Sequence, residues 1–494
     1  MKRFLSILFL GLCLWGGGVS GALGALSGDR FMDLCRSGTP KEVRSALKKG
    51  APVDFCHREG WTPLMVAAAK NPSPQVISLL IKAGAEVDAR NKDGWTALML
   101  AAAMNPNAAV AGALLDGGAA VDARNREGWT PLMVAAARNG NSQVVLALLK
   151  KKADVNARNK DGWTPLMAAA AKTSRGEIVA ALLKAGAEVD ARNKDGWTAL
   201  MLAAAMNAHP EISETLIEAG AEVGLRDPRG ITPLMAAATS NANPRVIARL
   251  LEAGAWRGAS EEGEWTPLMA AAWHNPNPDV IAALLRGGLC VDARDQEGAT
   301  PLMMAARESS PGVVEALLRG SPDVNARDQE GRTPLVFAAQ GASQDRTIRL
   351  LVGAGGDVHS RSALGWTPLM YAAAMNPNPS VTVSLIEAGA DPNATSGEGF
   401  PPLLFAVLEN PNPQVVAALI RGGADPRARF PHGRTLLMMA ALKGSHPEAL
   451  LELLRGGADP QARDQEGRRA LEYARENPRL RDTPAYWKLN DLSY

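Results

Sequence analysis

A six-residue signature recurs along this chain, most fully as Gly-Trp-Thr-Pro-Leu-Met, and its spacing limits the fold more than any other feature. Thirteen copies occur, separated by 34 residues with a single step of 33. They begin at Gly60, Gly94, Gly128, Gly162, Gly196, Gly230, Glu264 (in the place of glycine), Gly298, Gly331, Gly365, Gly399, Gly433 and Gly467. This period predicts a stacked array of small units, because each unit is too small to bury its own apolar face and must pack on its neighbours.

The signature itself predicts the start of a short helix. Thr62 stands at a position where an N-cap residue accepts an amide hydrogen bond, and Pro63 suits the first helical position because it has no amide hydrogen. Residues 64–69 then supply a small, apolar helix.

A second helix follows after a proline-rich break at 71–74. Pro74 suits its first turn, and Val76, Ile77, Leu80 and Ile81 fall on one face, which we expect to be buried. A glycine at position 84 then ends the helix, and residues 87–94 lead to the next signature as a finger-like turn. The repeating unit is therefore helix, turn, helix and finger.

These units resemble the ankyrin repeat, whose family pattern reads Thr-Pro-Leu-His-x-Ala in the first helix and Gly-Ala-x-Val-Asn-Ala after the second. The matches include Thr62-Pro63-Leu64-Met65-Val66-Ala67, Thr130-Pro131-Leu132-Met133-Val134-Ala135 and Ala153-Asp154-Val155-Asn156-Ala157, with variants from about Gly28 to Ala474. The resemblance implies an all-α ankyrin-repeat solenoid of about 14 units, including degenerate caps.

The chain departs from the family pattern in two ways. Most units carry one extra residue near the turn between the helices. Methionine also replaces the usual histidine in ten units, at Met65, Met99, Met133, Met167, Met201, Met235, Met269, Met303, Met370 and Met438. The hydrogen bonds of the family histidine are therefore not expected here.

Composition limits the classes of partner. The 53 basic and 51 acidic residues nearly cancel, so neither a nucleic-acid clamp nor a polybasic membrane patch is indicated. A solenoid also grows along one axis, so we expect one elongated, monomeric domain rather than several globular ones.

The two ends differ from the repeats. Residues 1–25 have Lys2 and Arg3 before an apolar run from Phe4 to Trp15, and the small residues 20–22 fit a signal-peptidase site. We therefore expect a cleaved signal peptide and an exported protein, periplasmic or secreted, that does not insert in a membrane. An uncleaved anchor is the alternative, although the run is shorter than the roughly 20 residues of a spanning helix. A lipid anchor on Cys13 is disfavoured by the leucine before it.

The remaining boundaries follow from the period. Residues 26–59 are expected to form a degenerate capping repeat and residues 60–466 the regular repeats. Residues 467–494 repeat only the first helix, as a capping half-repeat, and their polar tail is expected to cover the last exposed core face.

Three cysteines remain after removal of the leader. In an oxidising compartment Cys35 and Cys56 are candidates for a disulfide across the first cap, which would be worth roughly 3 kcal/mol. The alternative is that both stay reduced. Cys290 has no partner, and no clustered histidines accompany these cysteines, so no zinc site is predicted.

The residue after the repeat glycine is the main candidate for partner binding. It is tryptophan in seven units, at Trp61, Trp95, Trp129, Trp163, Trp197, Trp265 and Trp366. The resemblance implies that this position lies where the finger meets the first helix, on the concave side that partners contact. Tryptophan is common in binding hot spots. The indoles either form a ladder that binds a partner or pack on the next finger and stiffen it, and one ring can do both.

An arginine also recurs four residues before the glycine, and Arg124, Arg158 and Arg192 are candidates to flank the tryptophan ladder. Alternating bases and acids follow it, as in Lys92-Asp93, which favours a solvated and self-compensating turn. The alternative is a cation–π pair with the indoles, worth about 0.5–2 kcal/mol.

Other chemistry has little support. The six histidines are scattered, and no catalytic or phosphate-binding motif occurs outside the leader, so we expect neither an enzyme nor a cofactor. The methionines are expected to fill the space between units, with copper(I) binding or oxidant buffering as the alternative. The finger at 256–264 loses the usual pattern and marks either a bend or the boundary of a binding segment.

These observations predict a non-enzymatic scaffold of the cell envelope or secreted space, which binds a protein through its concave face. The alternatives are a secreted effector that engages a host protein and a periplasmic, methionine-rich stress or metal-buffering protein.

Overall fold

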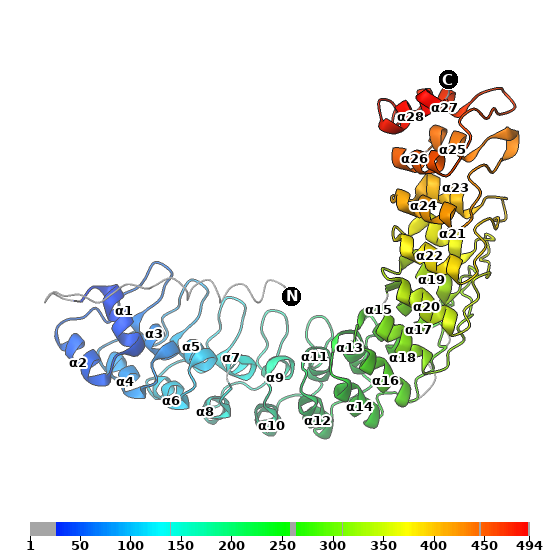
Figure 1. Ribbon diagram of the computed structural model, residues 1–494. Helices are drawn as coiled ribbons and strands as arrows, with labels where there is room; N and C mark the ends of the chain where they lie inside the picture. Colours follow the sequence, from blue (N-terminus) through cyan, green and yellow to red (C-terminus); the bar gives the residue numbers. More distant parts are fainter. Residues whose placement is uncertain (1–25, 139, 257–262, 309, 444–445, 493–494) are drawn as a thin grey trace. The chain divides into compact units, whose positions relative to one another are not determined.

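The computed structural model describes residues 26–138, 140–256, 263–308, 310–443 and 446–492 (Figure 1). In these residues the regular structure is helical, with isolated bridges at Gly263–Asp295 and Arg429–Thr435. The elements are α1 (Gly28–Ser37), α2 (Pro40–Lys48), α3 (Pro63–Lys70), α4 (Pro74–Lys82), α5 (Ala97–Met104), α6 (Ala108–Asp116), α7 (Pro131–Arg138), α8 (Ser142–Lys150), α9 (Pro165–Lys172), α10 (Gly176–Lys184), α11 (Ala199–Met206), α12 (Pro210–Glu218), α13 (Pro233–Ser240), α14 (Pro244–Glu252), α15 (Pro267–His274), α16 (Pro278–Arg286), α17 (Pro301–Glu308), α18 (Pro311–Leu318), α19 (Pro334–Gly341), α20 (Asp345–Gly353), α21 (Pro368–Met375), α22 (Pro379–Glu387), α23 (Pro402–Glu409), α24 (Pro413–Arg421), the 3₁₀ turn η2 (Pro431–Gly433), α25 (Leu436–Lys443), α26 (Pro447–Arg455), α27 (Ala470–Glu476) and α28 (Pro484–Leu492).

The chain divides into two compact units, Met1–Lys160 and Asp161–Tyr494, rather than the single domain expected from the repeats. Within each unit the first helices of successive pairs pack on one another, and so do the second helices. In the first unit, for example, α3, α5 and α7 form one row and α4, α6 and α8 the other (Figure 1). Each helix pair packs mainly on its neighbours, so a long array can divide without losing its local order.

The predicted helix start is confirmed. Thr62 Oγ1 accepts a hydrogen bond from Met65 N at 3.3 Å, and Pro63 is the first residue of α3. The same threonine cap begins α5, α9, α11, α13, α15 and α21. Because the signature fixes the cap, it fixes the position of these first helices.

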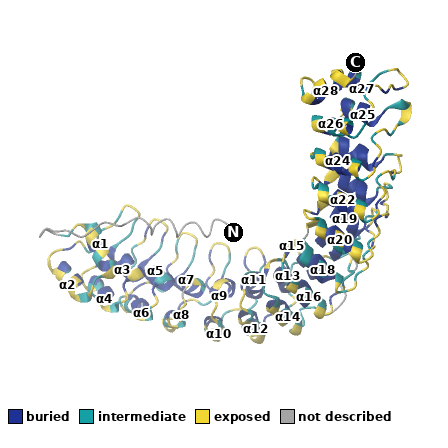
Figure 2. Ribbon diagram, viewed as in Figure 1, coloured by how far each residue is buried: buried dark blue, intermediate teal, exposed yellow. Residues whose placement is uncertain are grey.

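First helices are buried almost all round, which explains their alanine-rich sequences. Every residue of α3 from Pro63 to Ala69 is buried. The second helix α4 is amphipathic, with Val76, Ile77 and Leu80 buried and Ile81 half-buried. In Figure 2 the buried residues accordingly concentrate where helices meet, and the exposed residues occupy the loops and the outer faces of helices. Small side chains let first helices approach neighbours on both sides.

The methionines that replace the family histidine lie in this core. Met65, Met99, Met133, Met167, Met201, Met269, Met303 and Met370 are fully buried, Met438 is 1 % exposed and Met235 is 6 % exposed. They fill the space between neighbouring units, as the sequence suggested.

The fingers are joined by main-chain hydrogen bonds. Asn91 N donates to Trp95 O within one finger, and Lys92 N donates to Glu59 O of the preceding finger at 3.1 Å. Gly60 has a φ of 81°, and a Cβ there would lie 2.8 Å from Asn91 Cα. Glycine is therefore required both by the backbone conformation and by the close approach of the next finger.

In seven repeats of the described chain a buried asparagine joins the first helix to its predecessor, and this link was not predicted. Asn241 Nδ2 donates to Ala204 O and Asn207 O, both at 2.8 Å, while its Oδ1 accepts from Asn243 N at 2.9 Å. Equivalent double bonds are made by Asn71, Asn105, Asn207, Asn275, Asn376 and Asn410. These amides satisfy the carbonyls at the ends of the preceding first helices. We call this set the buried asparagine ladder.

Two further polar links run parallel to it. Asn243, which caps the second helix α14, donates from Nδ2 to Ala208 O at 2.6 Å in the preceding turn. An aspartate at the base of several fingers forms the other link, since Asp88 Oδ1 accepts from Ala120 N of the next unit at 3.0 Å. The extra residue of each unit thus lies in the turn between its two helices, and this turn is hydrogen-bonded to the corresponding turn of the preceding unit, as Asn243 is to Ala208.

At the chain ends, the first cap contains the expected helix pair, and Thr39 and Glu42 form a capping box at the start of α2. The last cap differs from the expected half-repeat. After α27 the tail forms a second helix, α28, which buries Ala485 and Leu489 and packs on α26 and α27. The sequence did not predict this helix, because only a few apolar residues, among them Ala485 and Leu489, mark its buried face within a polar tail.

Among the described residues the thiols of Cys35, Cys56 and Cys290 are all free, so the structure does not contain the expected Cys35–Cys56 disulfide. Cys35 is buried in α1, and this burial raises the pKa of its thiol to about 12. Cys56 is instead exposed in the first finger. The two thiols therefore lie in different environments and are not bonded to one another in this structure.

Three sequence-based expectations fall outside the described residues. They concern the leader at 1–25, the lipid anchor on Cys13 and most of the irregular finger, at 257–262.

The buried asparagine ladder gives a stability prediction. Replacing Asn241 with Ala leaves two buried carbonyls without a donor and is expected to lower the free energy of unfolding by about 2–4 kcal/mol. Asn243→Ala is the matched control, because it removes a half-buried cap and is expected to cost about 1 kcal/mol. Urea unfolding followed by circular dichroism measures both, and hydrogen exchange in α11 and α13 localises the loss. Equal losses would show that the buried amide has no special role.

Candidate binding surface

In each unit the fingers and the first helices that follow them form a surface, and we call this type of surface the finger face. Trp61, Trp95, Trp129, Trp163, Trp197 and Trp366 are half-buried on this face, and Trp265 is 39 % exposed. The rings are therefore neither sealed in the core nor free in solvent. Each lies at the junction between a finger and its first helix, as the sequence predicted.

Where their contacts are defined, the tryptophans pack toward the next repeat. The indole Nε1 of Trp197 donates to Asp227 Oδ2 at 3.0 Å in the following finger. The Trp366 ring lies 4.1 Å, between centroids, from Phe405 in the following first helix. Both contacts favour the stiffening role, and the remaining exposed part of each ring is available to a partner.

Trp265 is placed differently from the others. Its ring meets Trp273 of the same repeat edge-on, with centroids 6.2 Å apart. The Arg307 guanidinium lies over Trp273 at 5.7 Å from its centroid. Trp265 is the most exposed of the seven tryptophans.

The finger arginines join neighbouring repeats through main-chain carbonyls. Arg192 Nη1 donates to Gly196 O of its own finger at 3.3 Å and to Arg226 O of the next at 2.8 Å. Arg124 Nη1 donates to Arg158 O at 2.6 Å. The same double bond is made by Arg90, Arg294, Arg327, Arg361 and Arg429. We call this contact the arginine bridge, and it gives these arginines a structural role.

The finger tips carry solvated ion pairs. Lys92 Nζ lies 3.4 Å from Glu59 Oε1 of the preceding finger, and both side chains are mostly exposed. Such a pair contributes little to stability. The alternating charges of the tips therefore compensate one another, as one reading of the sequence proposed.

A further pairing on the finger face was not predicted. In two of the three repeats where arginine replaces the tryptophan, an aromatic residue occupies the helix position five residues later. The Arg332 guanidinium lies 4.8 Å from the Phe337 centroid, and that of Arg468 lies 4.1 Å from Tyr473. The spacing of five was visible in the sequence, but the direction of the two side chains was not.

Asp227 is the most strongly bonded acid of this surface. Its Oδ1 accepts from Arg229 N and Ile231 N, and its Oδ2 from Arg229 Nε and from the Trp197 indole. Burial by itself raises the pKa of this carboxyl, but the hydrogen bonds outweigh it and hold the pKa below the ordinary 3.8.

The described residues contain no group of three or more histidine, cysteine, aspartate or glutamate side chains that could hold a metal ion. Their helices include none that is long and apolar enough to cross a membrane.

Comparison with family models gives a direct assignment. The model "Ankyrin repeats (3 copies)" matches in overlapping segments at 31–125, 101–193, 132–227, 169–261, 203–295, 234–328, 311–396 and 403–482. This chain is an ankyrin-repeat protein. Among solved structures it is similar to the human ASB11 ankyrin repeat domain, with 26% identity and a TM-score of 0.41 over 47% of this chain and 100% of that one. A comparison with curated proteins returned no match.

The bond between Trp197 and Asp227 predicts a pH dependence in this ankyrin-repeat protein. Because the folded pKa of Asp227 is lowered, its contribution to stability is fully present above the unfolded pKa and is lost as the pH falls through the folded value. Asp227→Asn should therefore destabilise most at neutral pH, and its difference from wild type should shrink below about pH 4. Trp197→Phe removes one donor to the Asp227 carboxylate, so the stability that Asp227 contributes at neutral pH should be smaller than in wild type. Unfolding midpoints measured from about pH 6 to pH 2 test both, and an unchanged pH profile in Trp197→Phe would contradict the bond.

Proposed function

We propose that this chain is an exported, non-enzymatic scaffold that binds a protein partner through its finger face. Ankyrin repeats generally mediate protein–protein interactions. The observation that supports the finger face is the placement of its indoles, which are anchored on one side by neighbouring residues and partly exposed on the other. A ring held in this way loses little further conformational entropy when a partner covers it.

The scaffold proposal also agrees with the repetition of the surface. Most repeats present the same arginine bridge and the same kind of finger, whereas catalysis needs one unlike constellation of groups held in one place. The buried methionines weigh against the metal-buffering alternative, because their sulfur atoms are not accessible to an ion in solvent.

Export is proposed from the leader sequence alone, with its basic start, apolar run and small residues at 20–22. Retention in the periplasm and release as an effector differ only in destination. Fractionation of cells that express the native chain, followed by mass spectrometry of its N-terminus, tests both. We expect a mature chain that begins between residues 23 and 26, outside the cytoplasm, and an intact leader on a cytoplasmic chain would contradict export.

Partner binding can be tested at the most exposed tryptophan of the finger face. Trp265→Ala is expected to weaken partner capture at least tenfold, which corresponds to about 1.4 kcal/mol, with little change in stability. Trp197→Ala should instead lower stability as well, because it removes the bond to Asp227. Partners captured from native envelope fractions are identified first, and affinities are then measured by calorimetry.

The matched control for this experiment is Trp487→Ala. Trp487 is 53 % exposed, but it lies on α28, a second helix outside the finger face. We expect this control to bind normally. If it weakens capture as much as Trp265→Ala does, the finger face is not the binding surface.

A further inference from the structure

The first finger lacks the arginine bridge. The position 34 residues before Arg90 is occupied by Cys56. Its thiol reaches only the neighbouring carbonyl, His57 O, at 3.6 Å. A cysteine side chain is too short to cross to the next repeat, so the space that arginine crosses elsewhere is left open.

Two carbonyls mark the open space. In the following repeat, Arg90 Nη1 donates to Gly94 O and Arg124 O. The equivalent carbonyls one repeat earlier belong to Gly60 and Arg90, and no residue of the described chain donates a hydrogen bond to either. Both residues line a pocket of about 180 Å³. The pocket thus retains the acceptors of an arginine bridge without its donor.

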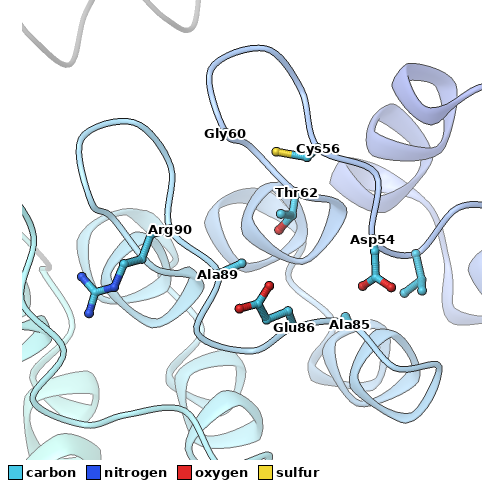
Figure 3. Close-up of a pocket in the computed structure, with 9 residues that line it drawn as sticks. Asp54, Cys56, Gly60, Thr62, Ala85, Glu86, Ala89 and Arg90 are labelled. Carbon is cyan, nitrogen blue, oxygen red and sulfur yellow. The ribbon is translucent and has the colours of Figure 1, made fainter.

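Two carboxylates complete the lining. Asp54 and Glu86 both border the pocket, together with Thr62 (Figure 3). Asp54 occupies the position of Asp88, which accepts from the next unit, but no described residue is bonded to the Asp54 carboxylate. The Arg90 side chain extends away from the pocket, toward Arg124 O. The pocket therefore presents acceptors and negative charge.

A second finger also lacks the arginine, and it differs from the first finger in the residues around the open position. Thr395 stands at that position, but Asn393 replaces the aspartate. Its amide is fully engaged, since Oδ1 accepts from Asp425 N at 2.9 Å and Nδ2 donates to Gly423 O at 2.9 Å. Only the first finger combines the missing arginine with two available carboxylates in the described chain.

We propose that this pocket, lined by Asp54, Cys56, Gly60, Glu86 and Arg90, receives an arginine side chain from an extended segment of the protein partner. The incoming guanidinium repeats the contacts of the arginine bridge, with its remaining N–H groups directed to the two carboxylates. A guanidinium suits this site better than an ammonium, because its planar fork reaches carbonyl and carboxylate oxygens together. This inference rests on the proposed protein-binding function and specifies one chemical feature of the partner.

The test uses a peptide rather than the partner, so that its result does not depend on the proposed function. Acetyl-Gly-Arg-Gly-amide is added to the purified chain, and binding is followed by ligand-observed NMR and calorimetry. The citrulline peptide is the neutral, isosteric control. The arginine peptide is expected to bind at least tenfold more tightly than the citrulline peptide, and the lysine peptide to fall between them. Equal binding of arginine and citrulline, or no binding of arginine, would overturn the proposal.

Substitutions then locate the binding. Cys56→Arg should fill the space from within the chain, raise the unfolding temperature and reduce peptide binding at least tenfold. Cys56→Ser keeps the space open and should leave binding unchanged. Asp54→Asn combined with Glu86→Gln keeps the shape and should weaken binding about tenfold. Retention of full binding by Cys56→Arg would place the peptide elsewhere and overturn the proposal.

Discussion

Many first helices of the described chain end inside the array, and the rest of the structure depends on how their last carbonyls are satisfied. Buried carbonyls without donors are costly in free energy. In seven repeats the chain solves this with the asparagine that follows the first helix, as Asn241 does for Ala204 and Asn207. The donor belongs to the next unit, so each of these units completes the one before it. Apolar packing brings the helices together, and these amides fix their relative position.

The same logic extends to the fingers, where the arginine bridge and the main-chain bonds connect neighbouring units at the other end of the repeat. Because the bridge is made by a side chain, it can be lost by one substitution without loss of the fold. Cys56 shows the result, since its neighbours keep their positions while the acceptors of Gly60 and Arg90 are left open. A structural contact in most repeats thereby becomes a candidate recognition site in one.

The tryptophans also combine two features, support for a neighbouring repeat and partial exposure to solvent. Trp197 and Trp366 support the next repeat through a hydrogen bond and a ring contact, yet neither ring is fully covered. Stiffening and binding are compatible because they use different parts of the indole. Trp265, with its support from Trp273 in the same repeat, leaves more of its ring to solvent and is the sharper candidate for binding.

The period, the threonine cap at Thr62 and the apolar face of 76–80 determined the repeat and its helices without coordinates, because these features act within one unit. The resemblance to ankyrin repeats placed the tryptophans between finger and first helix, but their degree of exposure is known only from the structure. The tertiary structure alone decided which side chains bond across units. Asn71 reads locally as a helix break, and Arg90 as a solvated turn residue, but both donate to carbonyls about one repeat away in sequence. Sequence also left open whether Cys35 and Cys56 pair, and in the structure both are free, with one thiol buried and the other exposed. Sequence spacing specifies what a unit is, whereas the direction of a side chain toward its neighbour is fixed only when the units are stacked.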